Sequence, residues 1–464
     1  MARPRNIDMC NGPIFKNLIL YTLPIIATSV LQLLYNTADS IVVAKFAGGE
    51  ALAAVSSNGA LINLVVNLFM GLSVGASIVV SNSYGANDAD GVHKTVHSAI
   101  GISVISGIVC MIAGLLVARD ALILMGTPEL VLDKATVYLR IYFIGMPVSM
   151  IYNFAAAVLR AVGDTKRPMY ILIMSGAVNV VLNLVLVMYT PLDVEGVAIA
   201  TVVSQVMSAV LAVYCLMSAH DSYRYEIKKT RIYKKPLLDM IRYGVPAGIQ
   251  GTVFSTSNVI IQSSVNSFGV AAIAGNAAAA NLESFTYVSM NAVYQSCLAF
   301  TSQNLGAKNY SKLRRILYIC IALVTVIGTV MSGLILVFQK PLLSLYIATA
   351  SVETTVPSAE IFNFGMRRIA IISMTYFLCG VMDTIVGGLR GLGTSLVPMT
   401  VSIIGVCGIR LVWIFTLFAA VGTFECLMWS YPVSWLITAI LHYICYNIKL
   451  SSVLKKAKNE ERKV

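Results

Sequence analysis

Charge is scarce in this sequence. Asp, Glu, Lys and Arg make up only 12% of the 464 residues, whereas an ordinary soluble domain has roughly twice that share. Hydrophobic residues make up 58%, and the mean hydropathy is +0.81. These charges are too few to cover a soluble surface. The composition therefore excludes a soluble globular protein and predicts an integral membrane protein.

Paired cysteines and cofactor ligands are lacking as well. The nine cysteines are scattered, most of them in apolar runs, without the paired spacing of a metal site or a disulfide framework. We therefore expect no cofactor. We also expect no cleavable signal peptide, because the apolar run after the basic N-terminal arm is too long and has no small-residue cleavage site. The first helix should remain in the mature protein.

Long apolar runs predict an all-α polytopic membrane protein with about twelve transmembrane helices, each able to cross roughly 30 Å of hydrocarbon. The first and seventh runs exceed this minimum and contain Pro24 and Pro246, which we expect to act as hinges. The expected spans are approximately residues 14–44, 51–81, 92–117, 131–158, 167–189, 194–218, 237–266, 270–302, 312–338, 356–386, 395–420 and 424–447.

The positive charge predicts the topology. Most of the 33 Lys and Arg residues fall in the terminal arms and in alternate connections, which places both termini in the cytoplasm of a plasma (bacterial cytoplasmic) membrane. The net charge of +12 therefore needs no nucleic-acid partner; we expect a monomer surrounded by membrane lipid. The expected parts are an N-lobe (1–218), a cytoplasmic linker (219–235), a C-lobe (236–447) and a basic cytoplasmic tail (448–464).

The two halves of the chain resemble each other. Because six helices is an even number, both halves start on the same side, and the repeat is parallel, about a pseudo-two-fold axis along the membrane normal. Such a repeat leaves a cavity between two six-helix lobes and is typical of secondary transporters. The matching positions are Tyr21 and Pro24 with Tyr243 and Pro246, Gly85-Ala86 with Gly306-Ala307, and Leu159-Arg160, Gly163 and Pro168-Met169 with Leu389-Arg390, Gly393 and Pro398-Met399.

One carboxylate, Asp39, lies in the first apolar run. Gln32, Tyr35 and Asn36 precede it at spacings that place all four residues on one helical face. An ionisable group within a membrane span is a functional-site hypothesis by default. The alternative is that Asp39 lies near the outer end of the helix and reaches headgroup water.

Several short motifs resemble those of the multidrug and toxic compound extrusion (MATE) family of efflux transporters, in order and over nearly the whole chain. The resemblance implies two six-helix lobes that open alternately to either face and export cationic or amphiphilic compounds in exchange for protons or sodium ions. The motifs are Tyr-Asn-Thr-Ala-Asp (35–39) with Phe-Ala-Gly (46–48), Ser-x-x-Tyr-Gly-Ala (81–86), Leu-Arg-Ala-x-Gly-Asp-Thr (159–165), Gly-x-Ala-x-Ala-Thr (196–201), Gln-Asn-Leu-Gly-Ala (303–307) and Leu-Arg-Gly-x-Gly (389–393).

The resemblance also implies an ion-coupling site in the N-lobe. Its positions match Asp39, Asn179, Asn183 and Thr201, and a sodium ion is a possible occupant of these four residues. Many relatives place an aspartate where Asn183 stands, so this chain offers one carboxylate instead of two. That departure weakens the case for sodium, whereas a proton needs only Asp39. The alternative role of the asparagines is interhelical hydrogen bonding.

Charges in the second half have no counterpart in the first. Arg410 needs an anionic neighbour at membrane depth, and Asp383 and Glu283 are the candidates. The cluster could be a structural ion pair or a coupling element, while Arg367, Arg368 and Arg390 are expected at the membrane interface. The polar residues expected to line the substrate cavity are Gln32, Tyr35, Asn36, Asn153, Glu283, Asp383 and Arg410.

Two other functions remain as alternatives. A lipid-linked precursor flippase with the same two-lobe plan would need several basic residues in its cavity, and Arg410 is the one mid-span candidate. An intramembrane enzyme would need a nucleophile with a base, or clustered metal ligands, at membrane depth. We find no pair of carboxylates at helical spacing there, so an enzyme is not expected.

Overall fold

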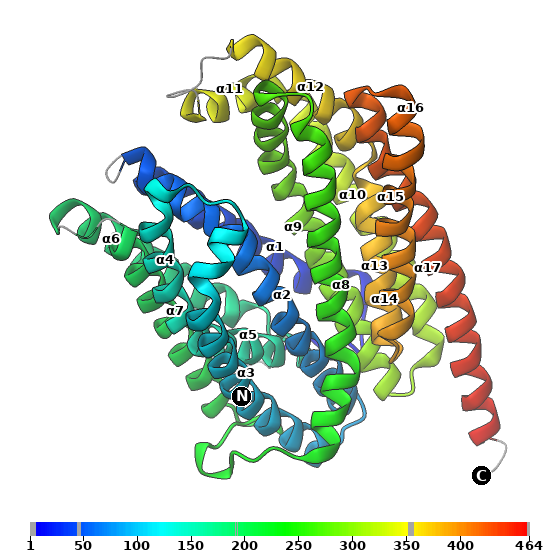
Figure 1. The fold of residues 1–464 in the computed structure, drawn as a ribbon. Helices are drawn as coiled ribbons and strands as arrows, with labels where there is room; N and C mark the ends of the chain where they lie inside the picture. Colours follow the sequence, from blue (N-terminus) through cyan, green and yellow to red (C-terminus); the bar gives the residue numbers. More distant parts are fainter. Residues whose placement is uncertain (1–5, 44–47, 191, 193, 351–356, 462–464) are drawn as a thin grey trace. The chain divides into compact units, whose positions relative to one another are not determined.

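Helices account for the fold of the described chain. The computed structural model describes residues 6–43, 48–190, 192, 194–350 and 357–461 (Figure 1). Among these residues, 7 helices are long and apolar enough to cross a membrane, or up to 9 if each of two bent helix pairs counts as one span. The Phe-Ala pair at 46–47, part of one family motif, lies outside the described residues.

The first helices follow the expected spans closely. Most begin and end near a predicted boundary because the length of an apolar run sets the length of the helix that can be buried in lipid. The exceptions are the third span, which continues to Leu124 and not to 117, and the fourth, which is divided into two helices. These first helices are α1 (Ile14–Val42), α2 (Gly48–Gly85), α3 (Ala89–Leu124), α4 (Glu129–Ile144), α5 (Met146–Ala161), α6 (Lys166–Tyr189) and α7 (Val194–Met217), followed by the short 3₁₀ helix η2 (Ile227–Lys229).

The later helices include two features that the sequence did not predict. One is the short extra helix α11, and the other is a pair of π-helical segments (403–408 and 414–418) within the eleventh span. The helices are α8 (Lys234–Asn266), α9 (Val270–Gly306), α10 (Tyr310–Val337), α11 (Gln339–Ala350), α12 (Ser358–Thr375), α13 (Phe377–Gly391), α14 (Leu396–Ser402), α15 (Ile409–Trp413), α16 (Ala419–Val421) and α17 (Phe424–Glu461).

The chain forms two compact units, Met1–Ile249 and Gln250–Val464. The boundary falls inside α8, because the first half of this helix packs against α2. A Cβ on Gly71 would lie 2.2 Å from the backbone nitrogen of Gly248, so the two backbones are in direct contact. The expected boundaries of lobes, linker and tail remain predictions.

Two spans are bent at equivalent positions. The α4–α5 pair bends by 48° and the α12–α13 pair by 45°. In the register that matches Leu159 with Leu389, the start of α5 at Met146 corresponds to Tyr376, where the second bend lies. The sequence predicts hinges at Pro24 and Pro246 instead. Both prolines lie inside the uninterrupted helices α1 and α8, and their role as hinges remains a prediction.

A glycine of a neighbouring helix faces each bend. A Cβ on Gly107 of α3 would lie 2.4 Å from the Cα of Pro147, and a Cβ on Gly328 of α10 would lie 3.1 Å from the Cα of Phe377. In the register of Gly85 and Gly306, the two glycines are also equivalent. The bent backbone therefore fits because the neighbouring helix has no side chain at that point.

The connection between α7 and α8 is packed against α3. Tyr223 and Tyr225 are buried in the core of the first unit. The backbone N–H of Glu226 donates to His97 Nε2 at 3.1 Å, and that of Tyr233 donates to Ser98 Oγ at 2.9 Å. The linker thus has defined contacts within the first unit.

Candidate functional site

Asp39 meets the asparagines of α6. Its carboxylate accepts a hydrogen bond from Nδ2 of Asn183, which is fully buried. The same Nδ2 donates to Oδ1 of Asn179 at 3.4 Å. Asn179 and Asn183 are one turn apart, so both amides lie on the face of α6 that packs against α1. The structure therefore brings three of the four predicted coupling residues together.

The contact between α1 and α6 is possible because a tyrosine of α1 packs against a glycine of α6. A Cβ on Gly176 would lie 1.9 Å from the ring of Tyr35, so the ring lies directly on the α6 backbone. The Tyr35 hydroxyl donates to the carbonyl of Ile173 at 3.4 Å. Tyr35 is one turn before Asp39, and this close approach positions the carboxylate against Asn183.

One oxygen in the site is left over. Oδ1 of Asn183 is buried and has no hydrogen-bond partner among the described residues. A buried polar atom without a partner is costly. A carboxylate oxygen beside a free amide oxygen is a donor set that suits a hard cation or a proton. The residues present therefore fit a coupling ion.

Apolar residues surround the site on further helices. The carboxyl end of α1 contributes Val43 to a cluster with Tyr138 of α4 and with Val194, Val197 and Ala198 of α7. Tyr138 interacts electrostatically with Asp39. Sequence reasoning missed this tyrosine, since nothing in the α4 sequence shows which helix it faces.

The fourth predicted coupling residue forms no hydrogen bond with Asp39 in the described structure. The hydroxyl of Thr201 donates to the carbonyl of Val197 in its own helix, at 3.0 Å. Since Val197 belongs to the apolar cluster around the site, Thr201 lies one turn beyond that cluster on α7. Its role in ion coupling remains a prediction.

The other polar residues expected in the first-half cavity are spread over two helices. Gln32 and Asn36 are exposed on α1. Asn153 lies on α5, where its Nδ2 donates to the carbonyl of Ser149 at 2.9 Å. The described hydrogen bonds therefore tie Asn153 to its own helix, and the substrate cavity remains a prediction.

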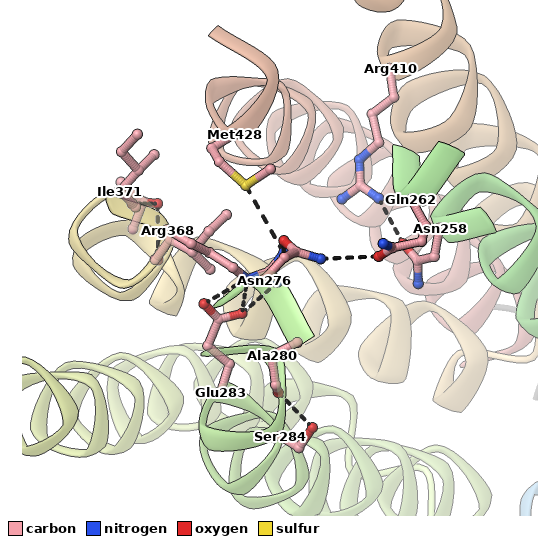
Figure 2. A network of polar contacts seen from close by, with 12 residues as sticks. Asn258, Gln262, Asn276, Ala280, Glu283, Ser284, Arg368, Ile371, Arg410 and Met428 are labelled. Carbon is pink, nitrogen blue, oxygen red and sulfur yellow. Dashed lines mark hydrogen bonds and ion pairs between the residues drawn. The ribbon is translucent and has the colours of Figure 1, made fainter. Parts of the chain in front are cut away.

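The buried ion pair of the second unit is not the one expected. Glu283 accepts from Arg368, with Nη2 to Oε2 at 2.7 Å and Nε to Oε1 and Oε2 at 3.1 and 3.2 Å (Figure 2). Arg368 is 7% exposed and so lies inside the second unit; its expected place at the membrane interface remains a prediction. Its Nη1 donates to Asn276 Oδ1 at 2.7 Å.

Arg410 has no acidic partner among the described residues. Its Nε donates to Ser434 Oγ at 3.1 Å and its Nη1 to Asn258 Oδ1 at 3.4 Å. The expected pairing of Arg410 with Glu283 or Asp383 is therefore wrong. The position of each charge along its helix can be read from the sequence, but several acids and bases lie at similar depths, so depth could not assign the partners.

Arg390 is also buried, in the last turn of α13, and its expected place at the membrane interface remains a prediction. Its Nη2 donates to Gln250 Oε1 at 2.8 Å and its Nη1 to the Tyr294 hydroxyl. Gln250 Nε2 in turn donates to Ser402 Oγ at 3.0 Å. Asp383 interacts electrostatically with Arg390 and with Tyr287. These residues form a second polar region, and none of its described hydrogen bonds involves the Arg368–Glu283 pair.

Two patterns in the chain are similar to catalytic motifs. In Gly71-x-Ser73-x-Gly75 the Ser73 hydroxyl donates to the carbonyl of Met70 at 2.7 Å, and both glycines pack on the α8 backbone. His97, four residues after His93, donates from Nδ1 to the His93 carbonyl at 2.8 Å and accepts from Glu226 at Nε2. Helix packing thus accounts for the Gly-x-Ser-x-Gly pattern, and hydrogen bonds to the backbone account for the histidine pattern.

Known proteins resemble this chain over most of its length. The MatE family profile matches residues 24–185 and 246–416. The probable multidrug resistance protein YoeA of Bacillus subtilis is 28% identical over 443 residues, which are 93% of each chain. An FAD transporter of Shewanella oneidensis is 23% identical over 96% of this chain and 98% of its own.

A solved structure shares the fold. It is the outward-facing conformation of a multidrug resistance MATE family transporter of the MOP superfamily. It matches with a TM-score of 0.89 at 20% identity, over 98% of this chain and 100% of the other. A likeness at this identity shows the arrangement of helices. The chain therefore has the fold of a polytopic helical membrane protein.

Proposed function

Because this chain belongs to the MATE family of multidrug efflux transporters, we propose that it is a secondary antiporter that exports cationic or amphiphilic small molecules in exchange for protons or sodium ions. The family confirms the resemblance seen in the motifs, and its members are transporters, not enzymes. The observation that carries the proposal is the contact between Asp39 and Asn183, which leaves one amide oxygen free beside a carboxylate.

The proposed topology has twelve spans with both termini in the cytoplasm of a bacterial membrane. The nine candidate spans leave out α2, α8 and α9, which have 38, 33 and 37 residues. Each of these three is long enough to cross a bilayer at about 1.5 Å per residue. Adding them gives the twelve expected from the apolar runs.

The coupling step depends on the charge of Asp39. When Asp39 is protonated, its O–H could donate a hydrogen bond to Oδ1 of Asn183 once the amide has flipped. A sodium ion could instead bind the Asp39 carboxylate oxygen and Oδ1 of Asn183. Either occupant neutralises the carboxylate, removes its need for the Asn183 donor and allows α1 to repack about Pro24. Thr28 Oγ1 donates to the Pro24 carbonyl at 2.7 Å, next to the proposed hinge.

Antiport follows from competition for one charge. A cationic cargo and a coupling ion would both be attracted by Asp39, so binding of one would lower the affinity for the other. Two ligands that exclude each other at a shared site exchange across the membrane when that site opens alternately to each side.

Transport in proteoliposomes tests the proposal. We expect the wild-type protein to move a cationic fluorescent dye under an imposed proton or sodium gradient, and Asp39→Asn to abolish this movement. Asn447→Ala is the matched control, because its Nδ2 donates to the carbonyl of Tyr443 within α17 and the residue has no proposed role in transport. Unchanged ion-driven transport by Asp39→Asn would remove Asp39 from the mechanism. Separate gradients identify the ion that drives transport.

A lipid-linked precursor flippase is the second candidate. The second unit buries Arg368, Arg390 and Arg410, more basic residues than the sequence suggested for a cavity. A pyrophosphate headgroup would need several of them, although Arg368 is already paired with Glu283. Translocation of a fluorescent pyrophosphate lipid without any ion gradient would favour this candidate over the antiporter.

A further inference from the structure

Arg410 is a buried cation to which no described residue supplies a counter-ion. Its side chain is 4% exposed, and an arginine stays protonated in proteins, so burial cannot neutralise it. An unpaired charge at membrane depth is expensive and is a functional-site hypothesis by default. The described residues place no carboxylate within ion-pair distance of its guanidinium.

The groups that the described structure places in contact with the guanidinium are neutral, and a second cation, Arg368, also acts on it electrostatically. Besides Ser434 Oγ and Asn258 Oδ1, it lies 4.2 Å from the centroid of the Tyr431 ring and 5.9 Å from that of Trp435. Cation–π contacts stabilise a buried guanidinium, but they leave its positive charge in place. Nη2 has no hydrogen bond to any described residue.

Neither Glu283 nor Asp383 pairs with Arg410 in the described structure. Glu283 is held by Arg368, whose remaining donor bonds Asn276 (Figure 2). Asp383 forms no ion pair with Arg410 in the described structure; Cys379 interacts electrostatically with both. Of the three charged residues described here, Arg368, Arg410 and Glu283, two are positive and one is negative.

The backbone around Arg410 is irregular as well. The residue lies in the short helix α15, between the two π-helical segments 403–408 and 414–418. Single π-helical turns inside α-helices are rare and occur frequently at functional sites. This feature is independent of the charge count and points to the same residue.

Polar side chains of α8 lie on the face that meets Arg410. Asn258 is exposed, and its Oδ1 accepts from Arg410, so its Nδ2 remains available as a donor. One turn later, Gln262 Oε1 accepts from Asn276 Nδ2 at 3.0 Å, which connects this face of α8 to the Arg368 pair (Figure 2). An anion at Arg410 would thus have a charged donor and an amide donor beside two aromatic rings.

We propose that Arg410, with Asn258, forms a subsite that binds an oxyanion group, a carboxylate or a phosphate, and that the transported molecules include amphiphiles with such a group. This inference rests on the proposed export function and narrows its substrate class. The guanidinium pairs with the oxyanion through two parallel N–H bonds, and the Tyr431 and Trp435 rings contact the apolar part of the molecule.

Binding is tested on the purified full chain in a neutral detergent. We expect phosphate and benzoate to raise the thermal unfolding temperature by a few degrees over chloride at equal ionic strength. Arg410→Met should lose this response and remain folded, because methionine is apolar and needs no partner for a buried charge. Arg119→Gln, at an exposed arginine, should respond as the wild type does. No anion response in the wild type, or an equal one in Arg410→Met, overturns the proposal.

Two further variants keep the test decisive if Arg410→Met does not fold. Arg410→Lys retains the charge and should keep a weaker response, and Asn258→Ala should weaken it several-fold without changing the charge. Reconstitution into neutral or anionic lipid identifies the source of the oxyanion. Stabilisation by anionic lipid that disappears in Arg410→Met assigns the subsite to a headgroup phosphate, which overturns the cargo part of the proposal.

Transport separates this inference from the proposed function. Arg410→Met should reduce export of a carboxylate-bearing dye at least tenfold and leave export of a cationic dye unchanged, whereas Asp39→Asn should abolish both. If the wild type exports the cationic dye alone, the oxyanion subsite has no transport role. If it exports neither dye under any gradient, the antiporter itself is wrong.

Discussion

The ring of Tyr35 occupies the space that a side chain at position 176 would fill. A Cβ on Gly176 would lie 1.9 Å from Cε2 of that ring, so α1 and α6 approach each other through a glycine. The same two helices carry Asp39 and Asn183 one or two turns further on. Packing at Gly176 therefore positions the candidate ion site.

Replacement of Gly176 by valine should displace Tyr35 and separate Asp39 from Asn183. Overpacking of this kind is destabilising by roughly 1–3 kcal/mol, and we expect ion-driven transport to fall more than thermal stability does. Gly333→Ala in α10 is the matched control, since a Cβ there meets nothing within 4 Å. Equal, full activity of both variants would show that the Tyr35 contact does not position the site.

A second carboxylate at position 183 should change the ion preference. Asn183→Asp places two acids beside each other, and like charges at short distance favour retention of a cation between them. We expect transport by this variant to become more dependent on sodium, measured as the ratio of dye export under sodium and proton gradients. A ratio equal to that of the wild type would argue that residue 183 does not contact the ion.

The buried Arg368–Glu283 pair should behave unlike a surface pair. Removing one partner, in Arg368→Met or Glu283→Gln, leaves an uncompensated buried group and should destabilise the protein by about 3–5 kcal/mol. The double variant should recover much of that loss, because no charge is then stranded.

An exposed pair supplies the comparison for that cycle. Arg119 and Asp133 lie 2.8 Å apart with half-exposed to exposed side chains, and such pairs contribute about 0–1 kcal/mol. Thermal unfolding of both sets of variants in one detergent measures the difference. A coupling energy for Arg368 and Glu283 no larger than that of the exposed pair would contradict the prediction.

The bends should depend more on the glycines than on the proline. Gly107→Val and Gly328→Val would each place a side chain against a bent backbone, and we expect a loss of about 1–3 kcal/mol or more from either. Pro147→Phe copies the residue found at the equivalent bend and should be tolerated better. The unfolding temperatures of the three variants provide the measurement; a greater loss for Pro147→Phe than for Gly107→Val would assign the bend to proline.

Sequence reasoning predicted the helices well because lipid thickness fixes their length. The expected first and eighth spans, 14–44 and 270–302, compare with α1 at Ile14–Val42 and α9 at Val270–Gly306. Helical spacing also placed Asn179 and Asn183 on one face, and the structure turns that face toward Asp39. Length and periodicity are properties of one segment, so one segment is enough to read them.

Partners between helices could not be predicted in the same way. Arg368 and Arg410 differ in whether an acid faces them, which depends on the rotation and packing of α9, α12 and α15. The bends were missed for a related reason: Tyr376 and Phe377 carry no local signal for a break, and the space for it is provided by Gly328 on another helix.

The two halves of the chain pack a bent helix against its neighbour in the same place with different residues. Both halves keep the recessed point, Gly107 or Gly328, while the residue that fills it is Pro147 in one and Phe377 in the other. The glycine is common to both halves, whereas the residue packed against it is not. A bend at this point therefore needs the absence of a side chain on the neighbouring helix more than it needs a proline on the bent one.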